Sequence, residues 1–113
     1  MKKSFCYRAC RDKYNNLYFM KTPSFLVIVT DNDGNEFRIH LHKIGEEWSA
    51  TEESTGLRCV PAPDTYRTID LCMDAVRRVT HLYDKLINRG DAPMYKRELM
   101  LYKKSLEEMN NEL

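Results

Sequence analysis

The sequence predicts an α+β fold, with an antiparallel sheet of four to six strands over residues 4–60 and two C-terminal helices at about 66–88 and 93–109. Two observations predict this fold. Residues 36–42 alternate polar and apolar side chains, as does a strand with one buried face. Residues 69–86 place apolar side chains at steps of three and four, the spacing of a helix that covers such a face. One of the two helices is therefore expected to pack on the sheet.

The strand segments are separated by turn signals. Asp33-Gly34 tolerates the positive φ of a tight hairpin turn, and Pro61-Ala62-Pro63 ends the sheet. The predicted strands are 25–30, 36–42, 48–52 and 57–60. In the second of them, one face carries Phe37, Ile39 and Leu41, and the other carries Glu36, Arg38, His40 and His42. This alternation predicts a sheet covered on one side only, with both histidines facing water.

Residues 1–24 admit two interpretations. Phe5, Tyr7 and Ala9 alternate as in a strand, and a turn-like segment at 14–16 separates them from strand-forming residues 17–20, which favours a hairpin. Cys6, Cys10 and Leu17 also fit helical spacing. Thr22-Pro23-Ser24 is expected to interrupt the chain before the next strand.

Two helical seams follow the sheet. The first helix starts between Asp64 and Thr68 and stops at Asn88-Arg89-Gly90, where glycine can adopt the left-handed conformation. Within it, Val76 and Val79 are expected to be the most buried residues. The second seam consists of Tyr95, Leu99, Tyr102, Leu106 and Met109. The whole chain, 1–113, is predicted to be a single domain with a basic N-terminal element (1–24), a sheet (25–60) and a helical hairpin (64–113).

Composition limits the class of protein. The 113 residues are 42% hydrophobic and 31% charged, which is ordinary for a globular domain. No apolar run approaches the roughly 20 residues of a membrane span, and the N-terminus lacks an apolar signal-peptide core. These features predict a small cytoplasmic protein. The four cysteines are then expected to be free, mostly buried thiols.

Charge is unevenly distributed, although the net charge is only +1. Residues 1–24 contain six basic side chains and one acidic one, Asp12, whereas residues 25–63 contain seven acidic and three basic side chains. Such a dipolar molecule can steer encounters with charged partners.

Catalytic signatures are missing from the sequence. It has no phosphate-binding loop, no Gly-x-Gly-x-x-Gly and no glycine-rich context around a cysteine or serine nucleophile. We therefore expect no enzyme activity, no catalytic residues, no cofactor and no metal. A zinc-binding domain is an alternative, because Cys6 and Cys10 have a spacing seen in zinc ligands, and His40 and His42 share one strand face.

Nucleic-acid binding is a second alternative. The N-terminal segment interleaves aromatic residues with six bases, a mixture that stacks on bases and neutralises phosphates. The bases are Lys2, Lys3, Arg8, Arg11, Lys13 and Lys21. If residues 4–16 were helical, the element order would be that of a double-stranded-RNA-binding domain, although residues 64–70 lack the lysine cluster of that family.

Protein binding is the favoured hypothesis, since the chain has seven tyrosines and six methionines and offers two candidate surfaces. The first is an acidic sheet edge that can imitate nucleic-acid phosphates: Asp31, Asp33, Glu36, Glu46, Glu47, Glu52 and Glu53. The second is on the last helix, at Tyr95, Leu99 and Tyr102, and this surface can also form a homodimer.

The layout of residues 25–113, an open antiparallel sheet followed by helices with no cofactor motif, resembles the small accessory proteins of phages and other mobile elements, such as anti-CRISPR inhibitors. The resemblance implies a non-enzymatic inhibitor that occludes a surface of another protein, such as a host defence nuclease. It assigns no functional residue.

Overall fold

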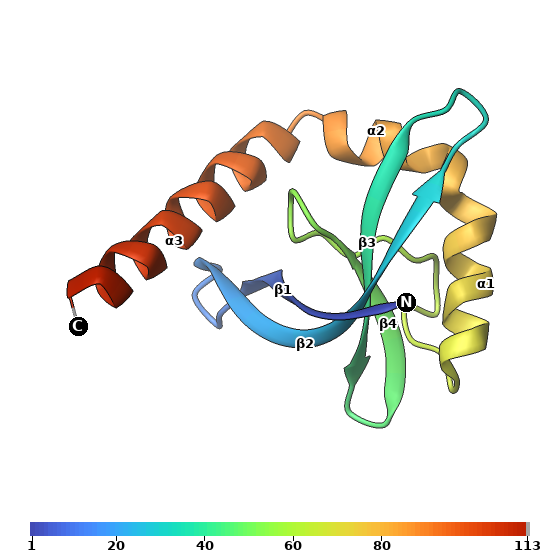
Figure 1. Ribbon diagram of the computed structural model, residues 1–113, viewed down its shortest axis with the longest axis horizontal. Helices are drawn as coiled ribbons and strands as arrows, with labels where there is room; N and C mark the ends of the chain where they lie inside the picture. The colour runs from blue at the N-terminus through green and yellow to red at the C-terminus, as the bar shows by residue number, and fades with distance from the viewer. Residues whose placement is uncertain (113) are drawn as a thin grey trace.

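The computed structural model of the chain describes the backbone of residues 1–112 and the side chains of residues 1–111. Four strands form one antiparallel sheet in the order β1-β2-β3-β4 (Figure 1). They are β1 (Lys2–Arg11), β2 (Leu17–Thr30), β3 (Glu36–Ile44) and β4 (Glu47–Glu52). The helical part follows as α1 (Ile69–Val79), the 3-10 turn η1 (Thr80–Leu82), α2 (Tyr83–Asn88) and α3 (Ala92–Glu112). The α+β prediction is confirmed, and so is the N-terminal hairpin.

Strand β2 changes partners along its length. Its first part, from Leu17 to Leu26, pairs with β1, whereas its pairing with β3 begins only at Phe25. The expected interruption at Thr22-Pro23-Ser24 does not occur, because β2 continues through it as a strongly curved strand (Figure 1). Pro23 has no backbone N–H to donate, and it lies where β2 has a partner strand on one side only.

The prediction of a one-sided sheet is wrong. On the expected core face, Ile39 and Leu41 are fully buried and pack with α1. On the opposite face, His40 and His42 are each only 1% exposed, so the expected solvated histidines are also interior. The cause is the curl of the sheet, which brings β1, β2 and the segment after β4 around the face that carries the histidines.

The segment after β4 nearly closes the curled sheet. The predicted strand at 57–60 is not a strand in the structure, which has only an isolated bridge between Arg58 and Thr51 there. The segment nevertheless runs back along β4 with two backbone hydrogen bonds, from Glu52 N to Leu57 O at 2.9 Å and from Cys59 N to Ala50 O at 3.0 Å. Before that return, the turn reaches the free edge of β1, where Ala9 N donates to Gly56 O at 2.8 Å. This contact links the first strand to the chain that follows the last one.

The first predicted helix is interrupted, because the 3-10 turn η1 separates α1 from α2. Thr68 caps α1 by accepting a hydrogen bond from Leu71 N, within the expected start, but α1 ends at Val79. The Thr80 hydroxyl donates to Val76 O at 3.0 Å, a side-chain bond that bends helices. Val76 is fully buried, as expected, whereas Val79 is only half-buried.

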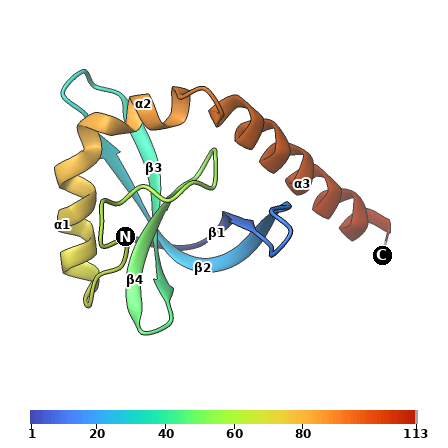
Figure 2. The same ribbon diagram turned by 180° about the vertical axis from the view of Figure 1, so that it is seen from behind.

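The helices do not form the expected helical hairpin. Figures 1 and 2 show α1 along one face of the sheet, α2 across its end, and α3 descending towards the β1–β2 hairpin and beyond it. Ala92 and Leu99 of α3 are buried in the interior of the protein. Within residues 1–112, no helix combines the length and the apolar character that crossing a membrane requires.

Candidate functional site

The predicted acidic edge is dispersed. Asp31, Asp33 and Glu36 lie at the β2–β3 turn, and Glu46 and Glu47 lie at the β3–β4 turn, which is at the opposite end of the sheet (Figure 1). The structure therefore does not unite these carboxylates in one surface.

The two remaining acidic residues are engaged within the fold. Glu52 is 4% exposed and accepts hydrogen bonds from the backbone N–H of Ser54 and Thr55, at 2.7 and 3.0 Å. Glu53 Oε2 lies 2.9 Å from Arg38 Nε and 3.0 Å from His40 Nε2. Burial alone would raise the pKa of Glu53, but these hydrogen bonds outweigh it, and the pKa lies below its ordinary value.

The predicted helical surface faces inward. Leu99 is 1% exposed, and the Tyr102 ring packs against Tyr7 and Phe19, with centroid distances of 5.7 and 5.6 Å. The Tyr95 hydroxyl accepts a hydrogen bond from Arg11 Nη2 at 3.0 Å. Tyr95 and Tyr102 attach α3 to the β1–β2 hairpin, and Leu99 is buried, so the three residues do not form a free binding surface.

The proposed zinc ligands do not gather into a cluster of three or more within residues 1–111. His40 uses both ring nitrogens within the fold, and His42 Nε2 lies 2.8 Å from Thr51 Oγ1. Burial raises the pKa of Cys6 to about 11 and lowers that of His42 to about 4, so both groups are neutral near pH 7.

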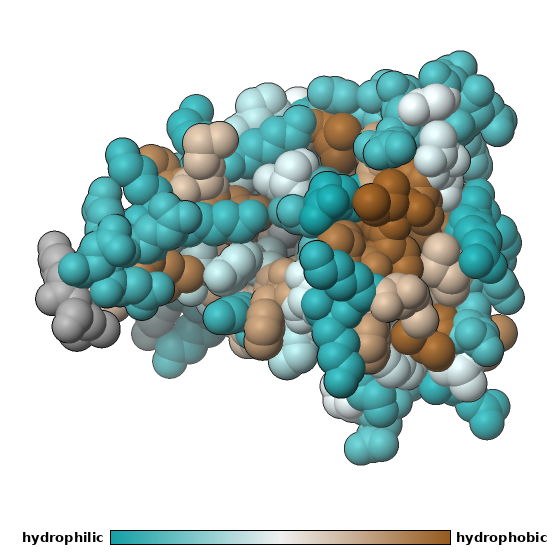
Figure 3. Space-filling model, viewed as in Figure 1, coloured by the Kyte–Doolittle hydropathy of each residue, from teal (hydrophilic) through white to brown (hydrophobic). Residues whose placement is uncertain are grey.

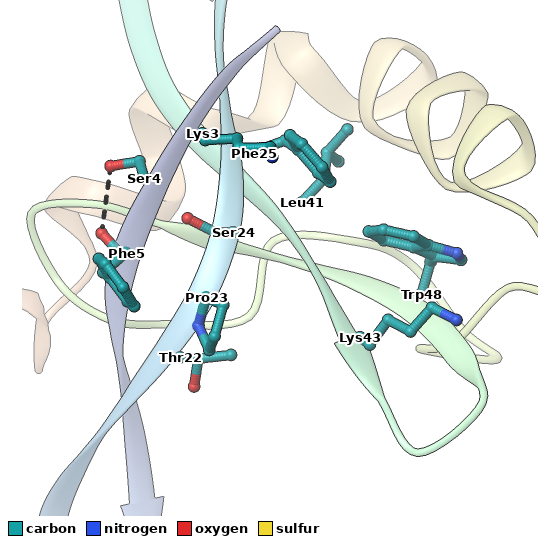
Figure 4. Close-up of a pocket in the computed structure, with 10 residues that line it drawn as sticks. All are labelled: Lys3, Ser4, Phe5, Thr22, Pro23, Ser24, Phe25, Leu41, Lys43 and Trp48. Carbon is teal, nitrogen blue, oxygen red and sulfur yellow. Dashed lines mark hydrogen bonds between the residues drawn. The ribbon is translucent and has the colours of Figure 1, made fainter.

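A hydrogen-bonded chain that sequence analysis missed connects Ser24, His40 and Glu53. Ser24 Oγ lies 2.8 Å from His40 Nδ1, and His40 Nε2 lies 3.0 Å from Glu53 Oε2. The order resembles the nucleophile, base and acid of a hydrolase triad. However, Ser24 is only 7% exposed, and Figure 4 shows its hydroxyl directed towards β1 and away from Leu41 and Trp48. The chain of bonds connects β2, β3 and the segment after β4.

A cleft of about 690 Å³ lies between the two halves of the sheet (Figure 4). It exists because β2 leaves β3 after the Phe25–Leu41 pair, while β3 and β4 continue together to the Ile44–Glu47 pair. Phe5 and Pro23 lie on one side of the resulting gap, and Trp48 lies on the other (Figure 4). We call this opening the aromatic–lysine cleft.

The cleft combines aromatic rings with ammonium groups. Its lining includes Phe5, Phe25, Trp48, Lys3 and Lys43, and no lining residue is acidic. The Phe25 and Trp48 ring centroids are 6.2 Å apart. Lys43 Nζ lies 5.5 Å from the centroid of the Trp48 ring, and Lys21 Nζ lies 4.6 Å from that of Phe5, which is 54% exposed.

The predicted basic residues are therefore divided among several sites. Lys3 and Lys21 belong to the cleft or its border. Arg8 lies on the other face of β1, where its Nε donates to Thr22 Oγ1 at 3.0 Å. Arg11 binds Tyr95, Lys13 lies over Tyr14 at the hairpin turn, and Lys2 is exposed. The sequence identified the N-terminal bases and Phe5 but did not indicate Phe25, Lys43 or Trp48, which come from other strands.

Comparison of the chain with protein-family models, with curated proteins and with solved structures gave no match. The strand at residues 4–11 also excludes the element order of a double-stranded-RNA-binding domain.

Proposed function

We propose that this chain is a non-enzymatic binding module that holds single-stranded nucleic acid in the aromatic–lysine cleft. The observation that supports the proposal is the pairing of ammonium groups with aromatic rings in a cleft that no carboxylate lines. Lys43 beside Trp48 and Lys21 beside Phe5 each place a cation next to a ring face. A nucleotide has the complementary arrangement, a phosphate next to a planar base.

Each component supplies a known contribution to such binding. An aromatic platform contributes about 1–3 kcal/mol per stacked base and tolerates any sequence. Lysines that neutralise phosphates add affinity that falls with salt, because counterions are released from the strand. The module is therefore expected to bind single strands with little sequence preference.

The protein-inhibitor hypothesis was based partly on an acidic edge, but the acidic residues of the two turns lie at opposite ends of the sheet (Figure 1). It stays a prediction without a defined site. An acidic peptide shares negative charge with a nucleic acid but lacks a base beside every charge, so the cleft favours the nucleic acid over the peptide.

Trp48 makes the proposal testable, because it is the one tryptophan of the chain and lies in the cleft. Titration with an oligothymidine of about 12 nucleotides should quench its fluorescence through base stacking. Lys3, Lys21 and Lys43 are expected to contact phosphates. Three such contacts give a slope of log affinity against log salt of about −2, so the affinity should fall about 16-fold between 50 and 200 mM salt.

Matched variants locate the binding. Lys43→Ala and Lys21→Ala should each weaken binding and reduce the salt slope by about 0.7, whereas Lys85→Ala on the exposed face of α2 should change neither. The proposal fails if the oligonucleotide leaves Trp48 fluorescence unchanged at low salt. It also fails if a poly-glutamate peptide quenches as strongly, because that result would assign the cleft to acidic protein segments.

A further inference from the structure

Strand β2 has a free edge at its C-terminal end. The register between β1 and β2 ends at the Lys2–Leu26 pair, whereas β2 stays paired with β3 as far as Thr30. Beyond Leu26, no strand of the described residues therefore lies on the other side of β2. A strand edge of this kind offers unpaired backbone N–H and C=O groups that a further strand can bind.

The direction of the backbone groups on this edge follows from the hydrogen bonds around it. In an antiparallel pair, the residues that exchange backbone hydrogen bonds recur at every second position. The bond from Asp31 N to Asn35 O, 3.0 Å long, sets this order between β2 and β3, so Val29 bonds to β3. The N–H and C=O groups of Ile28 and Thr30 consequently point away from β3, to the free edge.

Helix α1 forms the opposite wall of a groove along this edge. We call it the edge groove, with residues 26–32 on one side and Met73 and Arg77 on the other. It consists of two adjoining openings of about 720 and 440 Å³, and Ile28, Met73 and Arg77 line both of them. Ile28 is 54% exposed, and Figure 3 shows apolar residues gathered at the surface over β2, beside α1. An extended segment in this groove would contact the edge of β2 and the side of α1 together.

The charges that line the edge groove are mainly positive. The basic side chains are Lys2, Arg38 and Arg77, and the one carboxylate among the lining residues is that of Asp31. The Asp31 carboxylate already accepts two backbone hydrogen bonds within its own turn, each 2.9 Å long. The groove therefore attracts negative charge.

Two of these basic residues also have a carboxylate neighbour outside the groove. Arg38 Nε lies 2.9 Å from Glu53 Oε2, and Arg77 Nη1 lies 3.7 Å from Asp74 Oδ1. Each contact uses a single nitrogen of a guanidinium group that offers five N–H donors. Both arginines therefore keep donors for a second carboxylate.

We infer that the edge groove binds an extended acidic segment of another protein, which adds to the sheet as a strand beside β2. Backbone hydrogen bonds to Ile28 and Thr30 hold the segment, and its carboxylates lie near the three basic side chains of the groove. The segment runs antiparallel to β2, because this direction continues that of β1 on the same edge and gives the more stable pairing.

The backbone edge favours a protein segment over a nucleic acid. A nucleic acid shares negative charge with an acidic peptide, but it has no alternating row of N–H and C=O groups to match those of the β2 edge. The edge groove and the aromatic–lysine cleft share no lining residue. The inference therefore does not depend on the proposed function, and each can fail without the other.

Amide hydrogen exchange measured by NMR spectroscopy tests the strand addition. The probe is the peptide acetyl-Glu-Val-Glu-Val-Glu-amide. In the free chain, the Ile28 and Thr30 amides should exchange faster than the Val29 amide, which is bonded to β3. At a peptide concentration ten times the Kd, exchange at Ile28 and Thr30 should become about tenfold slower.

Two outcomes of this measurement would overturn the inference. The first is unchanged exchange at about 1 mM peptide, a concentration at which even weak complexes form. The second is slow exchange at Ile28 and Thr30 in the free chain that slows further as the protein concentration rises, because a second copy of the chain would then occupy the edge.

A modified peptide separates strand pairing from charge attraction. The same sequence with a methyl group on every backbone nitrogen keeps all side chains and loses all backbone donors. It should bind at least about tenfold more weakly, because the hydrogen bonds to the β2 edge are lost. Equal binding of the two peptides would show that charge alone holds them and would contradict strand addition.

Two neighbouring arginines of α1 test the charge of the groove. Arg77 and Arg78 are both exposed, but only Arg77 lines the groove. Arg77→Glu should weaken peptide binding about 3- to 10-fold, whereas Arg78→Glu, with the same change in net charge, should leave it nearly unchanged. Equal losses would place the peptide elsewhere. An oligothymidine that slows exchange at Ile28 and Thr30 more than the peptide does would assign the groove to nucleic acid and also overturn the inference.

Discussion

The backbone N–H of Ala9 donates a hydrogen bond to the carbonyl of Gly56 at 2.8 Å, although the two residues are 47 positions apart. This bond joins the edge of β1 to the turn that follows β4. Gly56 has a φ of +73°, and a Cβ atom placed on it would lie 2.6 Å from the Tyr7 carbonyl oxygen. The closure of the sheet therefore requires glycine for two reasons, the left-handed backbone and the close approach of β1.

Gly56→Ala should consequently destabilise the protein more than Gly45→Ala. Gly45 also has a positive φ, of +61°, but a Cβ there would meet no atom within 4 Å. The control variant thus shares the backbone strain of about 1–2 kcal/mol and lacks the clash. We expect an additional loss of about 1–3 kcal/mol in the free energy of unfolding for Gly56→Ala, measured by urea denaturation. Equal losses in the two variants would contradict the close contact with β1.

His42 should make stability fall on mild acidification. Burial lowers its pKa from 6.5 to about 4, whereas the unfolded chain has the ordinary value. Between these pH values the unfolded state binds a proton that the folded state does not, so the free energy of unfolding decreases as pH falls from about 6.5 to about 4. The full effect is about 3 kcal/mol.

The measurement is the urea midpoint at pH 7, 5.5 and 4.5, which is compared between the wild type and His42→Gln. Glutamine carries no titrating proton and retains a polar group near Thr51, so the pH dependence over this range should become shallower. An unchanged dependence in the variant would assign the acid sensitivity to other groups, such as Glu53, whose pKa is also displaced.

The two valines of α1 should differ in their tolerance of charge. Val76→Asp places a carboxylate in a fully buried position between α1 and the sheet, with a cost of several kcal/mol that approaches the whole stability of a small domain. Val79→Asp puts the same group at a half-buried position next to an opening, where water reaches it. Circular dichroism at 25 °C should show an unfolded Val76→Asp chain and a folded, less stable Val79→Asp chain. A folded Val76→Asp variant would mean that α1 does not pack on the sheet as described.

Local patterns were sufficient to predict much of the fold. The alternation at 36–42, the Asp33-Gly34 turn and the helical seams are properties of neighbouring residues, and the structure contains the corresponding elements. The break at Thr80 was not predicted, although the side-chain bond from Thr80 to Val76 O that accompanies it joins residues only four positions apart.

The aromatic–lysine cleft could not be predicted from local patterns, because it is formed by residues that are distant in the sequence. Phe5, Phe25 and Trp48 come from three strands, and no local spacing relates them. They meet because β2 exchanges partners at Phe25 and the two halves of the sheet diverge there. The nucleic-acid hypothesis involved the N-terminal segment alone, whose residues form only one side of the cleft.

The sequence by itself indicated most of the strand and helix segments, because periodicity separates the side chains of an element into two faces. Only the tertiary structure decided what covers each face. His40 and His42 show the difference: their alternation with Ile39 and Leu41 indicated a second face, and their polarity suggested water. The curl of the sheet instead surrounds them with Ser24, Thr51 and Glu53, whose hydrogen bonds compensate for the lost hydration.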